Sequence, residues 1–279
     1  MAYLKEKSRW PGCHEHETTR QKGKNIMENN ETQTSIPVAK VKEQRENYFV
    51  SLDLSKIEVS LEEMMKNGVH FGHQKSRRNP KMDEYIFTTR KSINIIDLEK
   101  TQEKIKEAMD FIQGLKKAGK NILFVGTKIQ VKGLVREVAN ACEMPFVSER
   151  WLGGTFTNFK VIRGRARYLL DGEAMLEKGE FKKYTKFEQM KKIEELQKME
   201  KRMGGIKNMS ELPGAIFATS VKEDNLAITE AQKLKIPVIA IVDTNVSPRG
   251  IDYPIPANDD AISSLRLILS YAYKAIAEA

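Results

Sequence analysis

The sequence predicts an α/β protein: a doubly wound parallel sheet of the Rossmann or flavodoxin type that carries an inserted α-helical coiled-coil hairpin. Residues 122–125 and 238–242 are entirely apolar, as strands are in a parallel sheet that is covered on both faces. Helical patterns alternate with such strands along the chain, which is typical of this architecture. A helical stretch rich in Lys and Arg, at 158–204, interrupts the alternation. We therefore expect one α/β domain, formed by residues 56–157 and 205–279, with the hairpin as its insertion.

Each element follows from its hydrophobic pattern and from its start and stop signals. The first helix, with Leu61 and Met64 at helical spacing, stops at Asn67-Gly68, and Asp97 is a candidate cap for the second helix. In chain order the expected elements are a helix at 61–66, strands at 86–87 and 93–96, a helix at 98–117, a strand at 122–125, a helix at 130–142, a strand at 146–147, the hairpin, a strand at 215–218, a helix at 225–234, a strand at 238–242 and a helix at 261–277.

The insertion is predicted as two antiparallel helices. Their apolar seams are Phe159, Ile162, Ala166, Leu169 and Leu176 in the first arm and Phe187, Met190, Ile193, Leu196 and Met203 in the second. A capping box of Thr185 and Glu188 starts the second arm, and Gly204-Gly205 ends it. Arms of about 20 residues span roughly 30 Å. Since basic side chains outnumber acidic ones, the insertion is either an RNA-binding element or an ordinary solvated coiled coil.

The octet at 151–158 joins the expected sheet to the hairpin. Its adjacent Gly153 and Gly154 allow the chain to leave the sheet sharply. Asn158 is a candidate cap for the first arm.

Composition narrows the functional class. The chain has 279 residues, a net charge of +9 and 30% charged residues, which suits a polyanionic partner. No apolar run is long enough to span a bilayer, so no membrane partner is expected. The two cysteines, Cys13 and Cys142, lie far apart, which argues against a disulfide framework. Residues 1–55 are polar and lack hydrophobic periodicity, and we expect a disordered extension there.

A nucleotide-dependent enzyme with an inserted lid is the alternative reading. Gly126 and Lys128 follow an apolar strand and open a helix, where anions can bind. The chain nevertheless contains neither a Walker loop nor a Gly-x-Gly-x-x-Gly after a strand. Asp243, Asp259 and Asp260 could serve an active site or cap helices, but no nucleophile and base accompany them. We expect no enzyme activity and no cofactor.

Two groups of residues contain side chains that could bind a metal. His70 and His73 flank Phe71-Gly72, but no second pair of Cys, His or acidic residues at ligand spacing accompanies them. The group of Cys13, His14 and His16 lies in the expected extension, where chance clustering is the better explanation. We therefore expect no metal site.

The segment 74–81 is the clearest candidate for RNA contact. It holds four cations within seven residues, and Arg90 and Lys91 follow closely. Such cations can contact phosphates, and nearby aromatic rings can stack on unpaired bases. Asn79-Pro80 would stiffen the loop. A solvated basic loop is the alternative.

The residues resemble the family of the bacterial-type second protein of the small ribosomal subunit. The matching blocks occur in order over about residues 59–275, at 70–74, 79–82, 126–128, 151–158, 204–207, 212–213, 236–238, 242–245 and 258–261. Each block is weak alone, whereas the ordered set is highly specific. Three sites depart from the family pattern: Arg78 replaces the usual aromatic, Thr219-Ser220 stands where an acidic residue is usual, and Ala257 replaces a glycine.

The resemblance implies a structural ribosomal protein that binds small-subunit ribosomal RNA and helps to dock the large mRNA-binding protein among its ribosomal neighbours. A bacterial cytoplasm is the expected location, with an organelle ribosome as the alternative. The implied RNA-facing residues of the basic loop and its flank are His73, Gln74, Lys75, Arg77, Arg78, Asn79, Lys81 and Arg90. The implied residues of the hairpin are Lys160, Arg163 and Arg167.

Overall fold

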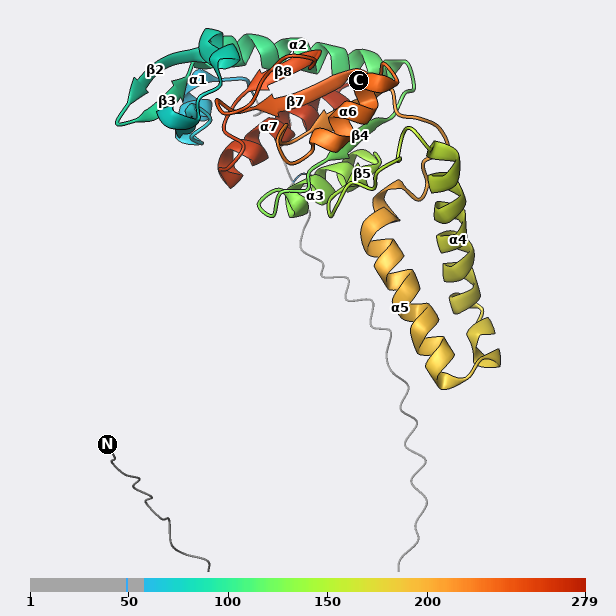
Figure 1. The fold of residues 1–279 in the computed structure, drawn as a ribbon. Helices are drawn as coiled ribbons and strands as arrows, with labels where there is room; N and C mark the ends of the chain where they lie inside the picture. Colours follow the sequence, from blue (N-terminus) through green and yellow to red (C-terminus); the bar gives the residue numbers. More distant parts are fainter. Residues whose placement is uncertain (1–48, 50–57) are drawn as a thin grey trace, which may run out of the picture. The chain divides into compact units, whose positions relative to one another are not determined.

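The computed structural model describes residue 49 and residues 58–279 (Figure 1). Its central sheet has five parallel strands in the order β5-β4-β6-β7-β8. Counted from the first strand, this is the 2-1-3-4-5 order of flavodoxin-like doubly wound sheets, so the expected parallel sheet is confirmed. The strands are β4 (Ile122–Val125), β5 (Phe146–Val147), β6 (Ala215–Ala218), β7 (Val238–Val242) and β8 (Tyr253–Pro256).

Helices cover both faces of this sheet, because successive strand residues point to opposite sides. Ile122 and Phe124 belong to one apolar cluster, together with α2 (Leu98–Lys117), α3 (Lys132–Cys142) and α7 (Ile262–Ala277). Leu123 belongs to the cluster on the other face, which contains α6 (Asn225–Lys233). Burial on both faces explains why β4 and β7 contain only apolar residues.

Strand β8 was not predicted, because Tyr253-Pro254-Ile255-Pro256 carries two prolines. Proline donates no hydrogen bond to a ladder and is therefore confined mainly to sheet edges. β8 is such an edge strand: it pairs with β7 alone within the described sheet.

A second, antiparallel sheet has the order β1-β3-β2. It consists of β1 (Phe71–Gln74), β2 (Ile86–Arg90) and β3 (Ile93–Ile96), and it follows the short helix α1 (Leu61–Lys66). Strand β1 was not predicted. The turn between β2 and β3 places Lys91 and Ser92 at positive φ, as two-residue hairpin loops require. Two 3-10 turns, η2 (Lys75–Arg77) and η3 (Pro80–Tyr85), occupy most of the basic segment.

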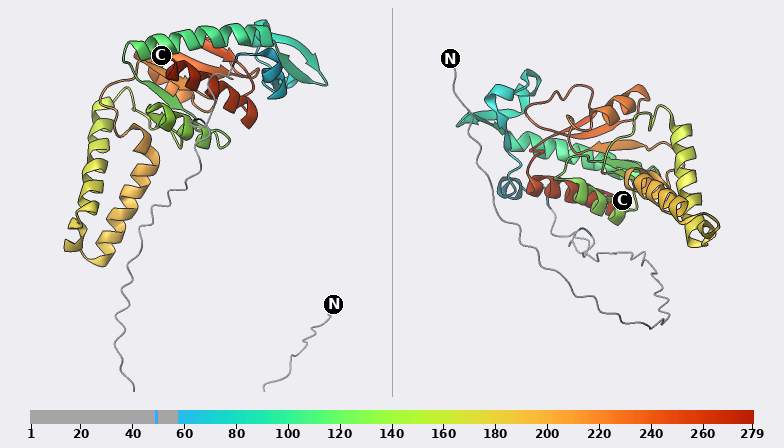
Figure 2. Two further views of the ribbon diagram at one scale, coloured as in Figure 1. Left: turned by 180° about the vertical axis from the view of Figure 1, so that it is seen from behind. Right: turned by 60° about the horizontal axis from the view of Figure 1, so that its bottom comes forward.

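Between β5 and β6 the chain forms α4 (Phe159–Glu177) and α5 (Lys186–Met203), which lie antiparallel beside each other (Figures 1 and 2). Leu169 and Leu196 pack together with Phe181 of the connecting turn. The capping box is confirmed, since Glu188 N donates to Thr185 Oγ1 over 3.4 Å and Thr185 N donates to Glu188 Oε2 over 3.1 Å.

The apolar seam of α5 was predicted wrongly at its beginning. Phe187 and Met190 are 70% and 66% exposed. Toward the sheet, Ile162 and Met203 are buried in the cluster that also holds β4 residues. The hairpin therefore packs firmly at its root, while the start of α5 leaves apolar surface in solvent.

Among the described helices, none is long and apolar enough to cross a membrane.

The predicted extension at 1–55 lies outside the described residues, apart from Phe49, as do Cys13, His14 and His16. Phe49 is completely buried, with its ring centroid 6.1 Å from that of Tyr273. At least one residue of that span therefore belongs to the core.

Candidate nucleic-acid interface

The basic loop is tied to the end of β7. Asn79 N donates to the carbonyl oxygen of Thr244 over 2.8 Å, and the Asn79 side chain accepts from Lys81 N over 3.0 Å. His73 N donates to Thr244 Oγ1 over 2.9 Å. Pro80 opens η3 at a position where it gives up no hydrogen bond. These contacts tie the loop to the sheet and constrain where its cations lie.

The structure divides the predicted loop residues into two groups. The exposed ones are Gln74, Lys75, Arg77, Lys81 and Arg90. The partly buried ones are His73, Arg78 and Asn79. Arg78 Nε donates to Asp83 Oδ1 over 2.7 Å, so this guanidinium already has an acidic partner. Asn79 binds the backbone of Thr244 through its N–H group and that of Lys81 through its side chain.

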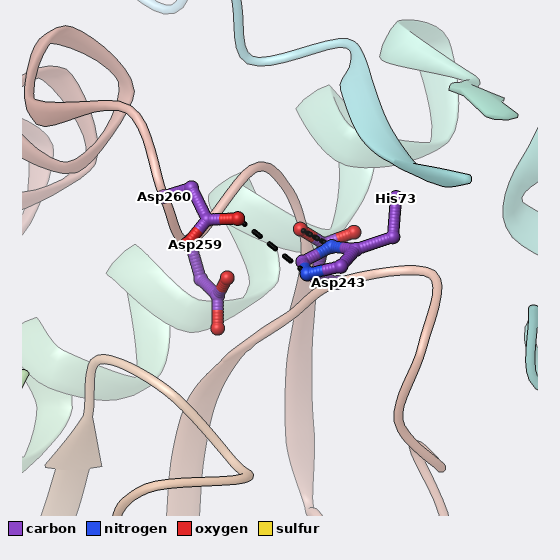
Figure 3. A group of neighbouring side chains, drawn as sticks. All are labelled: His73, Asp243, Asp259 and Asp260. Atoms are coloured by element: carbon purple, nitrogen blue, oxygen red, sulfur yellow. Dashed lines mark hydrogen bonds and ion pairs between the residues drawn. The ribbon is translucent and has the colours of Figure 1, made fainter. Parts of the chain in front are cut away.

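His73 points toward the carboxyl end of the parallel sheet (Figure 3). Its Nδ1 lies 2.9 Å from Asp243 Oδ2 and its Nε2 lies 3.4 Å from Asp260 Oδ2. The hydrogen bond with Asp243 raises the pKa of His73, although burial acts in the opposite direction. Both ring nitrogens thus face carboxylates, and the ring joins the loop to the sheet.

Lys128 completes an ionic network at this edge. Its Nζ lies 3.0 Å from Asp259 Oδ1 and 2.6 Å from Asp260 Oδ1. Burial opposes the charge of Lys128, but its hydrogen bonds to Asp260 and Asp259 raise its pKa overall. Ser220 Oγ donates to Asp259 Oδ2 over 2.7 Å. Lys128, Ser220 and His73 therefore bind the carboxylates of Asp243, Asp259 and Asp260.

Helix capping, one of the two roles considered for Asp259 and Asp260, is not what the structure shows at the start of α7. Asn258 Oδ1 accepts from the N–H groups of Asp260 and Ala261, over 2.9 and 3.3 Å. The amide side chain of Asn258 makes the turn before α7, which leaves both carboxylates free to bind Lys128.

Four residues at this edge offer donor atoms within 4.8 Å of one another: His73, Asp243, Asp259 and Asp260. In the sequence, His73 pairs with His70 as a possible set of metal ligands, but His70 is not in this group. The chemistry of the set suits a divalent cation. The ammonium group of Lys128 already lies on two of the carboxylates, so the arrangement is also complete as an ion-pair network.

In a nucleotide-binding enzyme the loop after such a strand binds phosphate. Here the loop after β4 binds a carboxylate of the protein itself. Thr127 N and Oγ1 donate to Asp224 Oδ1 over 3.2 and 2.8 Å. Burial raises the pKa of Asp224 to about 6. Gly126 permits close packing, because a Cβ there would lie 2.7 Å from Val135 Cγ2. Within the described residues, Asp224 thus occupies the anion position at this strand end.

The octet at the root of the hairpin is held by a residue that sequence reasoning missed. Glu230 accepts hydrogen bonds from Trp151 Nε1, from the N–H groups of Gly154, Phe156 and Thr157, and from Thr157 Oγ1, over 2.7 to 3.3 Å. Burial opposes ionisation, but these donors lower the pKa of Glu230 overall. A single acidic residue within a predicted helix carries no sequence signal for such a role.

Two predictions for the octet have different outcomes. Gly154 has φ +90°, so the sharp exit at this glycine is confirmed. Asn158 occupies the position before α4 but makes no side-chain capping hydrogen bond, so the predicted cap is wrong. The neighbouring N–H groups of Phe156 and Thr157 are bound by Glu230 instead.

The predicted hairpin cations Lys160, Arg163 and Arg167 line one groove of about 460 Å³ along α4. All three are exposed, and their spacing places them on one face of the helix. Lys207 also lines the groove and lies 3.0 Å from Glu173 and 3.2 Å from Glu200. The groove therefore presents the three α4 cations beside a lysine whose charge is already balanced.

Comparison with known protein families gives a match over most of the chain. The model of the family described as Ribosomal protein S2 matches residues 64–279. That span contains the basic loop, both sheets, the helical hairpin and the ionic network.

Proposed function

This chain belongs to the ribosomal protein S2 family, structural proteins of the small ribosomal subunit, and from that premise we propose that its exposed cations bind small-subunit ribosomal RNA and support assembly and translation. The observation that carries the proposal is a group of four exposed loop cations on a rigid support: Lys75, Arg77, Lys81 and Arg90. Within the described part of the chain none of the four takes part in an ion pair. Uncompensated cations of this kind gain most from contact with phosphates.

The second proposed contact is the groove of α4. Lys160, Arg163 and Arg167 lie at helical spacing along it, which suits a run of phosphates. We also propose that α4 and α5 pair as an antiparallel coiled coil around Leu169 and Leu196. The hairpin would then act as a rigid basic arm inserted into the α/β domain.

The partners and the location follow from the family. We propose that the protein contacts neighbouring small-subunit proteins and helps to dock the large mRNA-binding one. Its place would be the ribosome of a bacterial cytoplasm, or of an organelle. A catalytic role has little support, because the polar groups at the carboxyl edge of the sheet bind one another, as Asp224 does with Thr127.

Salt-dependent RNA binding tests this proposal. Arg77→Ala should weaken binding to small-subunit ribosomal RNA and reduce the slope of log affinity against log salt by about one unit for each lost phosphate contact. Arg78→Ala should have a smaller effect, since Asp83 already holds that side chain. Filter binding at a series of salt concentrations measures both quantities.

Lys106→Ala is the matched control, because Lys106 is an exposed lysine on α2, outside both proposed contacts. It should leave affinity and slope unchanged. If Arg77→Ala and Lys106→Ala give the same slope as the unchanged protein, the loop is not part of the interface. Failure of the full-length protein to co-sediment with small subunits would contradict the wider proposal.

A further inference from the structure

The antiparallel sheet β1-β3-β2 turns one face outward. Register pairs Phe71 and Thr88 with Ile95, and Gln74 and Arg90 with Ile93, so these side chains share a face. The alternate residues of β3 are buried: Asn94 completely and Ile96 almost so. Asn94 Nδ2 donates to the carbonyl oxygen of His73 over 3.0 Å. One face is therefore packed inside, and the other has no covering element among the described residues.

Aromatic and aliphatic groups form part of the outward face. Phe71 is 47% exposed and Ile93 is 37% exposed. Phe87 is 75% exposed and lies where the register between β2 and β3 shifts, so it is the extra residue of a β-bulge. Bulges turn a side chain out of the regular ladder. Two phenylalanine residues on one small sheet are thus exposed, Phe71 by about half and Phe87 by more.

The exposed charges around this face are mainly positive. Residues 68–82 and 86–96 contain no acidic residue, whereas Lys75, Arg77, Arg90 and Lys91 are all exposed there. Of the two acids between these segments, Asp83 is held by Arg78, whereas Glu84 is exposed. Gln74, Arg77 and Ile93 line one recess of about 360 Å³, whose acids are paired with His73 and Lys128.

A ligand that fits this face carries flat apolar groups on a chain of negative charges. Single-stranded RNA has that chemistry, since its unpaired bases expose π-faces and its backbone carries the phosphates. Duplex RNA hides the faces of its bases within the stack. An acidic protein surface lacks the regular alternation of flat rings and charges.

We infer that the outward face of β1-β3-β2 binds unpaired ribonucleotides, with bases stacked on Phe71 and Phe87 and phosphates on Arg77 and Arg90. The inference rests on the proposed RNA-binding function and adds to it the kind of RNA, unpaired, and the side chains that distinguish it from duplex. Stacking supplies affinity without sequence preference, because every base has a π-face.

Fluorescence anisotropy with two labelled RNAs tests the inference: a short oligouridylate, and a duplex with the same number of phosphates. Phe71→Ala and Phe87→Ala should each weaken oligouridylate binding by about tenfold, within the range for one stacked base. Duplex binding and the salt slope should stay unchanged, because no cation is lost. Phe71→Tyr should restore binding, because tyrosine keeps the ring.

Phe187→Ala is the matched control, since Phe187 is an aromatic residue on α5 that is 70% exposed. It should leave oligouridylate binding unchanged. Phe71 also packs near Gly68 and His70, so circular dichroism should confirm that Phe71→Ala folds. Phe87→Ala and Phe71→Tyr keep the test decisive if it does not.

Two outcomes would overturn the inference. One is that Phe87→Ala and Phe71→Ala bind oligouridylate as tightly as the unchanged protein, while Arg77→Ala still weakens binding to ribosomal RNA; RNA binding then stands without stacking. The other is that the phenylalanine variants lose co-sedimentation with small subunits but not oligouridylate binding, which would assign the face to a protein. Absence of ribosomal RNA binding by the unchanged protein would instead remove the proposed function itself.

Discussion

At the scale of single residues, one carboxylate organises the root of the hairpin. Glu230 is bound by five donors of the octet, and two of the donor residues, Trp151 and Phe156, are themselves buried. The two rings pack edge to face, with centroids 4.9 Å apart. The glycines allow the turn, whereas Glu230 determines which conformation the turn adopts. Glu230 is therefore a positioning residue for the basic arm.

Replacement of Glu230 measures this role. Glu230→Ala should lower the free energy of unfolding by about 3 kcal/mol or more, because several buried N–H groups lose their acceptor at about 1–3 kcal/mol each. Glu230→Gln keeps one carbonyl oxygen and should lose less. Urea unfolding gives the values, and Glu223→Ala, at an exposed acid just before α6, is the control. Equal midpoints for Glu230→Ala and Glu223→Ala would show that Glu230 does not hold the octet.

At the scale of elements, two glycines of α4 distinguish the packed part of the hairpin from its solvated side. A Cβ at Gly172 would lie 2.5 Å from Leu196 Cδ2, whereas a Cβ at Gly164 would meet nothing within 4 Å. The arms thus approach each other closely at Gly172. A sequence pattern shows both glycines as equal weaknesses in a helix.

Alanine at these two positions should have opposite effects. Gly164→Ala should raise the free energy of unfolding by about 0.5–1 kcal/mol, since alanine restricts the unfolded chain and favours helix. Gly172→Ala should lower it by about 1–2 kcal/mol, because the added methyl group displaces Leu196. Thermal unfolding followed by circular dichroism compares them. If both substitutions stabilise the protein equally, α4 and α5 do not pack at Gly172.

At the scale of the whole molecule, the ionic network joins the basic loop to the parallel sheet. His73 of β1 reaches Asp243 at the end of β7, and Lys128 after β4 reaches Asp259 before α7. Gly72 allows close approach, because a Cβ there would lie 2.5 Å from Thr244 Cγ2. Segments far apart in the sequence therefore hold the small sheet and its cations in place.

This connection predicts a pH dependence of stability. The pKa of His73 is raised above 6.5 in the folded protein, so its contribution is complete below pH 6.5 and is lost as pH rises through the folded pKa. The free energy of unfolding should therefore fall as pH rises above about 6.5, and His73→Gln should flatten this fall.

His70→Gln is the control for the pH experiment. Burial lowers the pKa of His70, so its effect has the opposite sign and appears as pH falls below 6.5. The variant should keep the alkaline fall. Persistence of that fall in His73→Gln would show that another group causes it.

Much of the fold could be predicted from local pattern. The apolar strands β4 and β7, the cap at Asp97 and the capping box at Thr185 depend on neighbours in the chain, and the structure confirms them. Strand β8 was hidden by its prolines, and β1 by a motif in which glycine and histidine interrupt any alternation. The start of α5 was misjudged, since periodicity in Phe187 and Met190 does not reveal whether a partner is present.

The candidate site was less predictable than the fold. The cations of the loop and of α4 could be named because charge clusters within a few residues, and exposure leaves most of them free to act as expected. The partners of His73, Arg78 and Glu230 could not be named. Each of these contacts depends on where a distant strand or helix ends, or on which way a side chain turns.

The sequence by itself determined the parallel sheet, the positions of its main helices, the basic character of the loop and hairpin, and, through an ordered set of blocks, the family. These properties follow from periodicity, local hydrogen bonds and composition, which are written along the chain. Only the tertiary structure decided which charges remain available to a partner. It turned His73 and Lys128 inward onto aspartates and left Arg77 and Phe87 in solvent, because desolvation and pairing depend on neighbours brought together in space.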